Sequence, residues 1–142
     1  MKPFIFAAIA LLLTSFGATV QAQSDVKVEV LAKTSKSWNG QPLPNYPSSR
    51  PEITMLKVTI PGGTRLPEHM HLVINAAVLL KGKITVVSED GKKLYLSAGD
   101  PIVELVNTWH YGLNEDVEPA ELIVFYAGTP NVPITIKKSS AK

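Results

Sequence analysis

From residue 50 onward, short apolar runs alternate with turn residues along the chain. Residues 54–60 alternate between apolar and polar side chains and end at Pro61-Gly62-Gly63, which cannot continue a regular ladder. Similar runs follow at 73–80, 83–88, 94–96, 102–106, 122–126 and 134–137. No window of a dozen residues in this part carries the 3.6-residue apolar stripe of a helix. The pattern predicts an all-β domain of short strands, arranged as a sandwich or barrel, with a hairpin turn at 89–92.

The N-terminal 22 residues have a different pattern. Lys2 precedes an apolar run at 4–13, and small residues follow up to Ala22. This is the arrangement of a secretory signal peptide cleaved after Ala22, and the apolar run is shorter than the roughly 20 residues that span a membrane. The sequence therefore predicts a periplasmic or secreted protein that begins at Gln23 and has no membrane segment after cleavage.

The remaining 120 residues are enough for one domain. We expect an N-terminal extension at 23–50, a barrel at 51–137 and a short tail at 138–142. Within the extension, residues 26–30 alternate and could form an edge strand, and Trp38 and Tyr46 are expected to pack over one end of the barrel. The chain has no cysteine, so it has no disulfides. The mature part has a formal charge near +1, which indicates neither a nucleic-acid partner nor an anionic membrane surface.

Candidate chemistry is concentrated in the three histidines of the chain, His69, His71 and His110. In an extended segment, residues two apart project from the same face, so the imidazoles of His69 and His71 could converge on one ion. His110 lies 39 residues after His71, far enough for intervening strands to return the chain to the same place. Neutral imidazole suits zinc, copper, iron and nickel, and histidine protonation predicts loss of the metal below about pH 6.5.

The residues around the histidines extend this pattern. Gly63 precedes His69 by five intervening residues, Gly82 closes the first segment, and a second segment runs from Gly99 through His110 to Asn114. Both segments resemble the two motifs of the cupin superfamily, and the chain is similar to its small single-domain type 2 members. The resemblance implies a double-stranded β-helix, also called a jelly-roll barrel, and a divalent transition metal (Fe, Mn, Cu, Ni or Zn) held by the three histidines. It also implies a homodimer.

Three positions depart from the family pattern. Asn75 stands where the family usually has a glutamate ligand, while Leu105 and Asn107 stand where proline and glycine are usual. Asparagine tolerates the left-handed backbone that glycine would adopt, so the change at Asn107 is mild. An amide oxygen carries no charge, so Asn75 is predicted to be a weak ligand or a hydrogen-bond partner near the ligands. The resulting site resembles that of cupins with three histidine ligands.

Two further residues are candidates for catalysis. Glu104 precedes the turn before His110 and could swing into the barrel as a ligand or an acid. Tyr111 neighbours His110 and could donate a proton or contact a substrate. Neither residue is one of the motif's defined positions, so a purely structural role is the alternative interpretation for each.

Open positions beside a divalent ion allow two chemistries. A redox-active ion could bind an organic substrate and oxygen together, whereas zinc could acidify a bound water molecule. The resemblance favours an oxidoreductase of the dioxygenase kind acting on a small organic molecule. The alternatives are a zinc-type hydrolase or isomerase, and a cupin that binds a metal or small ligand without catalysis.

Overall fold

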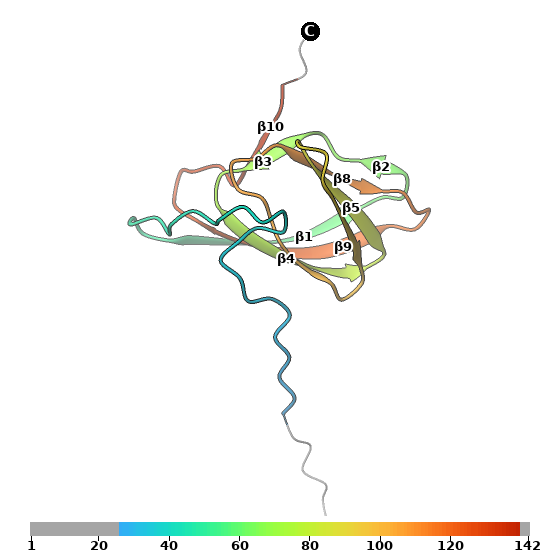
Figure 1. Ribbon diagram of the computed structural model, residues 1–142, viewed down its shortest axis with the longest axis horizontal. Helices are drawn as coiled ribbons and strands as arrows, with labels where there is room; N and C mark the ends of the chain where they lie inside the picture. Colours follow the sequence, from blue (N-terminus) through green and yellow to red (C-terminus); the bar gives the residue numbers. More distant parts are fainter. Residues whose placement is uncertain (1–25, 140–142) are drawn as a thin grey trace, which may run out of the picture.

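The computed structural model describes residues 26–139, and within that range it consists of β-strands and loops without a helix (Figure 1). The predicted signal peptide and cleavage site at Ala22 lie outside the described residues. No helix long and apolar enough to cross a membrane occurs in the described range. The strands are β1 (Glu52–Ile60), β2 (Thr64–Arg65), β3 (His69–His71), β4 (Ile74–Lys81), β5 (Lys83–Ser88), β6 (Lys93–Ser97), β7 (Pro101–Val103), β8 (His110–Asn114), β9 (Ala120–Gly128) and β10 (Thr135–Lys137).

The strands form two antiparallel sheets that face each other. One sheet has the order β1-β9-β4-β7, and the other has the order β10-β3-β8-β5-β6 with β2 paired to β8. In Figure 1 the first sheet forms the lower wall of the molecule and the second forms the upper wall. This arrangement is a jelly-roll β-sandwich, so the predicted all-β double-stranded β-helix is confirmed.

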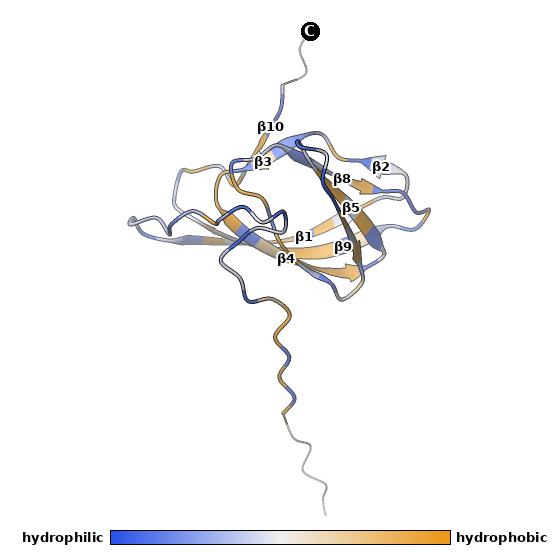
Figure 2. Ribbon diagram, viewed as in Figure 1, coloured by the Kyte–Doolittle hydropathy of each residue, from blue (hydrophilic) through white to orange (hydrophobic). Residues whose placement is uncertain are grey.

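The core lies between the two sheets, and β4 and β8 bury every second side chain. In β4 the buried positions are Asn75, Ala77 and Leu79, and their neighbours are more exposed. Facing them across the interior are Ile84 and Val86 of β5. Figure 2 shows β4 and β9 as largely hydrophobic strands, which is expected where one sheet supplies much of the interior. Burial of these side chains is the main favourable term for the fold, at about 25 cal/mol per Å² of apolar surface.

The observed strands follow most of the predicted runs. The hairpin at 89–92 joins β5 to β6, with Gly91 at a φ of 80°. The run at 102–106 is cut short, because β7 ends at Val103 and the chain then turns toward His71, with which Val106 forms an isolated parallel bridge. Strand β8 was not predicted as a strand, since its sequence, HYGLN, lacks the β-branched residues that mark one.

The N-terminal extension behaves differently from the prediction. Residues 26–30 form no strand and are exposed, so the edge strand expected from their alternation is absent. Alternation alone does not supply a pairing partner. Tyr46 is also exposed, whereas Trp38 packs against the core and its backbone N–H donates to the Val103 carbonyl oxygen (2.9 Å). The extension therefore contacts the end of β7 through Trp38 and is held there by this hydrogen bond.

Candidate metal centre

The pairing of β3 with β8 brings the three histidines together. His69 and His71 project from the same face of β3, and His69 lies directly opposite His110 of β8. Their ring centroids are 4.5–5.1 Å apart, and one possible ligand nitrogen from each ring lies within 4.8 Å of the others. His71 and His110 are buried and His69 is half-buried. The strand register thus places three imidazoles around one point.

Each imidazole is oriented by an oxygen acceptor at its Nδ1 atom. The Nδ1 of His69 lies 2.8 Å from the Pro67 carbonyl oxygen, and that of His110 lies 2.9 Å from the Thr108 carbonyl oxygen. The Nδ1 of His71 lies 2.9 Å from the Thr135 hydroxyl and 3.2 Å from the Ile134 carbonyl oxygen. A carbonyl oxygen only accepts, so Nδ1 carries the proton and Nε2 keeps its lone pair. This hydrogen-bonding pattern is typical of metal-binding histidines.

Burial favours the neutral form of all three imidazole rings. It lowers the pKa of His69 and of His110, and it lowers the pKa of His71 to about 3, with the neighbouring His110 and His69 adding to the effect on His71. Metal ions bind the neutral form of imidazole. The buried Nε2 of His110 also has no hydrogen-bond partner among the described residues. A neutral, oriented and unpaired donor set fits a divalent cation.

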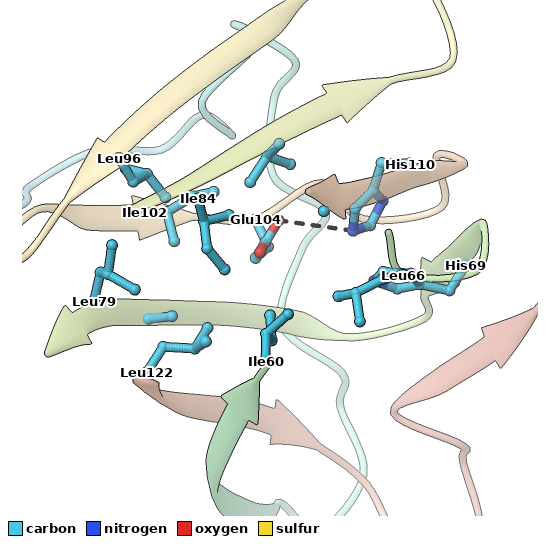
Figure 3. A pocket seen from close by; sticks show the side chains of 13 residues that line it. Ile60, Leu66, His69, Leu79, Ile84, Leu96, Ile102, Glu104, His110 and Leu122 are labelled. Atoms are coloured by element: carbon cyan, nitrogen blue, oxygen red, sulfur yellow. Dashed lines mark ion pairs between the residues drawn. The ribbon is translucent and has the colours of Figure 1, made fainter. Parts of the chain in front are cut away.

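Glu104, the first candidate for catalysis or ligation, lies beside this cluster. It follows β7 and points into the interior, and its side chain is 13% exposed. Its Oε2 lies 3.7 Å from Nε2 of His110, along the dashed line in Figure 3, and has no hydrogen-bond partner in residues 26–139. Burial raises the pKa of Glu104 to about 7, although the nearby His69 and a backbone hydrogen bond with Leu105 act in the opposite direction. Near pH 7 this carboxyl group can both give and take a proton.

Asn75 occupies the neighbouring position on β4. The backbone N–H of Glu104 donates to the backbone carbonyl oxygen of Asn75 (3.1 Å), so the two residues lie opposite each other where β7 ends beside β4. Asn75 is fully buried, and its Nδ2 donates to the Val73 carbonyl oxygen (3.3 Å). Its Oδ1 has no hydrogen-bond partner among the described residues. The amide is therefore inside the barrel, although it lines neither of the cavities that contain His69.

Tyr111, the second candidate for catalysis, points away from the histidine cluster. Alternation along β8 turns His110 and Gly112 inward and Tyr111 outward. Its ring lies under the guanidinium of Arg65, 3.9 Å from the ring centroid, on the outside of the barrel. This contact is a cation–π interaction that packs the surface.

Two asparagines of the second motif stabilise its loops. Asn107 has a φ of 55°, so the prediction that it adopts the left-handed backbone of a glycine is confirmed. Its N–H donates to the His71 carbonyl oxygen (2.8 Å). Asn114 is buried, and its Nδ2 donates to the carbonyl oxygens of Ile60 (3.0 Å) and Glu118 (2.9 Å). Both residues hold the backbone beside the histidines through these hydrogen bonds.

Two adjoining cavities meet at His69 and Glu104. The inner cavity has a volume of about 50 Å³ and is mainly aliphatic, with His69, His110 and Glu104 as its polar side chains (Figure 3). Six of its apolar side chains are Leu66, Leu79, Ile84, Leu96, Ile102 and Leu122. The outer cavity has a volume of about 280 Å³ and adds His71, Tyr126, Thr135 and Lys137.

The contributions of β9 and β10 to the outer cavity were not predicted. Thr135 contacts His71 from 64 positions away, and Tyr126 stacks edge-on against the His71 ring at 5.5 Å. Neither lies in a motif, so the sequence carried no signal for them. The only sequence clue was that both belong to runs predicted as strands.

Comparison with known families decides the identity of the fold. A sequence model described as the cupin domain matches residues 56–126, which contain all three histidines and Glu104. The chain is a cupin. A comparison with curated protein sequences gives no significant match.

Solved structures with this fold include enzymes of different activities. An oxalate oxidase in complex with the substrate analogue glycolate has a TM-score of 0.52 and 19% identity, over 60% of this cupin and 45% of that chain. The DMSP lyase DddQ from Ruegeria pomeroyi has a TM-score of 0.54 and 20% identity, over 61% and 43% of the respective chains. The oxalate decarboxylase from Lactobacillus farciminis, in a formate complex, has a TM-score of 0.53 and 20% identity, over 60% and 26%.

These likenesses establish the fold. This cupin spans less than half the length of each of the three enzymes. The cluster of His69, His71 and His110 supports binding of a divalent metal ion.

Proposed function

We propose that this cupin is an exported metal-dependent enzyme of the oxygenase kind that acts on a small, partly apolar organic molecule. The observation that carries the proposal is the convergence of three neutral imidazoles, each oriented through Nδ1, at the mouth of an apolar cavity. His69, His71 and His110 would hold the ion. A redox-active ion bound there would supply electron transfer between an organic substrate and oxygen.

The cavities suggest how a substrate would be bound. The inner cavity of about 50 Å³ holds only a few water-sized groups, so it suits a short apolar end of a molecule. The outer cavity of about 280 Å³ accommodates the remainder beside His69 and His71. Aliphatic walls exclude water from the inner end, and Glu104 can accept or return a proton there at Oε2.

The hollow interior favours an enzyme over a module that only binds. A cupin whose interior were filled by side chains would leave no room for a substrate beside the ion. Here the room exists, and a carboxyl group with a pKa raised to about 7 by burial faces it. A group with that pKa is suited to acid–base catalysis near neutrality. The same observation favours a second candidate, a zinc-dependent hydrolase or isomerase in which Glu104 transfers the proton.

We also propose that the protein is a homodimer. The outer face of the four-stranded sheet presents large exposed apolar side chains on three adjacent strands: Ile53 and Met55 of β1, Leu80 of β4 and Phe125 of β9. Met55 and Phe125 lie directly opposite each other, so their two apolar side chains are adjacent on this face. Such patches are typical of interaction surfaces. Light scattering at micromolar concentration should give twice the mass of the chain, and Phe125→Asp should give a monomer; a monomeric parent protein would refute the proposal.

The first experiment is a metal analysis of the mature chain, from Gln23 onward, purified from the periplasm without chelators. We expect about one redox-active ion per chain, and its loss in His71→Ala. Tyr111→Phe is the matched control, because Tyr111 lies outside the barrel. An oxygen-uptake screen with small organic acids and related molecules then follows. One zinc ion per chain would favour the hydrolase or isomerase, and no ion in a folded parent protein would refute a metal-dependent enzyme.

A further inference from the structure

Three neutral histidines leave the charge of a divalent ion uncompensated in an apolar interior. Burying a charge without a partner is costly, and stable sites pair it with an opposite charge. Among the described residues, 26–139, Glu104 is the one carboxylate that lines the two cavities. We propose that Glu104 supplies the anionic ligand of the metal centre, from the end of β7. This inference rests on the proposed metal-dependent function and refines it: in the metal-bound protein Oε2 of Glu104 is the fourth ligand, and its free acid–base role belongs to the metal-free state.

The geometry supports this assignment through two unpaired atoms. Oε2 of Glu104 and Nε2 of His110 are both buried and both lack a hydrogen-bond partner in the described part of the chain, although they are only 3.7 Å apart. Zinc-type ions bind nitrogen and oxygen at about 2.0–2.2 Å, so two ligand atoms on one ion lie up to about 4 Å apart. The observed separation fits one ion between the two atoms. A direct hydrogen bond would require a shorter distance.

The backbone of Glu104 is anchored from two directions. Its N–H donates to the Asn75 carbonyl oxygen of β4 (3.1 Å), and its carbonyl oxygen accepts from the Ser37 hydroxyl (2.8 Å). The side chain therefore starts from a fixed position on the wall of the cavity. Ser37 belongs to the N-terminal extension, so this segment helps to position the ligand.

Asn75 provides an internal comparison for the charge argument. It faces Glu104 across the strand pair, it is fully buried, and its Oδ1 also lacks a partner in residues 26–139. It differs from Glu104 in carrying no charge. The double variant Asn75→Glu/Glu104→Gln thus moves the carboxylate from the end of β7 to the neighbouring strand β4.

The test measures binding of Co²⁺ alone, by competition with a chelator and by its visible absorption spectrum. Co²⁺ is a suitable probe because its absorption reports the number and type of its ligands. The parent protein should bind one Co²⁺ per chain. Glu104→Gln should weaken the affinity by about tenfold or more and change the spectrum, because an anionic ligand is replaced by a neutral one. Glu104→Asp should give an intermediate affinity.

The controls separate ligation from a structural role. Glu121→Gln makes the same chemical change at a half-buried carboxylate that pairs with Lys57 on the outside of the sheet, and it should leave affinity and spectrum unchanged. The double variant should recover most of the lost affinity. If Glu104→Gln binds one Co²⁺ with the affinity and spectrum of the parent protein, the ligand assignment is overturned while the three-histidine site stands. If the folded parent protein binds no Co²⁺, both proposals fail.

Discussion

Replacing Glu104 by glutamine should stabilise the metal-free protein at high pH. The carboxyl group is 13% exposed, its Oε2 has no hydrogen-bond partner among the described residues, and the surrounding cavity is largely aliphatic. Burial raises its pKa from 4.5 to about 7. Without a metal ion, the ionised form is therefore destabilised in the folded state and not in the unfolded chain.

The sign and size of the effect follow from proton linkage. Because the folded state holds this proton more tightly, its stability falls as the pH rises through the interval between 4.5 and about 7. The shift corresponds to about 1 kcal/mol of lost stability at pH 5 and about 3 kcal/mol at pH 8. Glutamine does not ionise. The free energy of unfolding of Glu104→Gln, taken relative to that of the parent protein, should therefore rise by about 2 kcal/mol from pH 5 to pH 8.

Urea unfolding of chelator-treated protein at pH 5 and pH 8 measures this difference directly. The three histidines titrate in both proteins, so their contribution largely cancels in the comparison. Glu121→Gln is the control for removing a carboxylate at the surface, and it should show the pH dependence of the parent protein. If the stabilities of Glu104→Gln and the parent protein change in parallel between pH 5 and pH 8, Glu104 is not a strained buried acid and the reasoning is wrong.

Three further predictions concern the neighbours of the site. Three ordinary imidazoles would lose about a thousandfold in Zn²⁺ affinity from pH 7.5 to 5.5. Burial lowers the pKa of all three histidines, so the Zn²⁺ affinity of Glu104→Gln should fall by clearly less than this over the same interval. Calorimetric titration at both pH values distinguishes these cases. Asn107→Val should cost about 1–3 kcal/mol in urea unfolding because a β-branched residue is strained at a φ of 55°, whereas Asn107→Gly should be nearly neutral; equal costs would contradict the backbone argument. Tyr111→Phe should leave the Zn²⁺ dissociation constant unchanged within about twofold, since the ring lies outside the barrel; a larger change would place Tyr111 in the site.

The fold and the histidine pattern were readable from the sequence to different extents. The alternation in 54–60 and 73–80 predicted strands because a half-buried strand repeats every two residues, and β1 and β4 follow it. The same alternation in 26–30 failed, since pairing requires a partner strand and none is present for this segment in the described structure. Strand β8 was missed because its composition does not favour a strand, and its pairing with β3, β5 and β2 overrides that preference.

The sequence by itself determined the all-β class, the shared face of His69 and His71, and the left-handed turn at Asn107. Each of these depends on the backbone geometry of adjacent residues. The tertiary structure decided that His110 lies opposite His69, that Glu104 turns inward and Tyr111 outward, and that Thr135 holds the His71 ring. Those outcomes depend on the register between strands that are distant in the chain, because a shift of one residue exchanges the inward and outward faces.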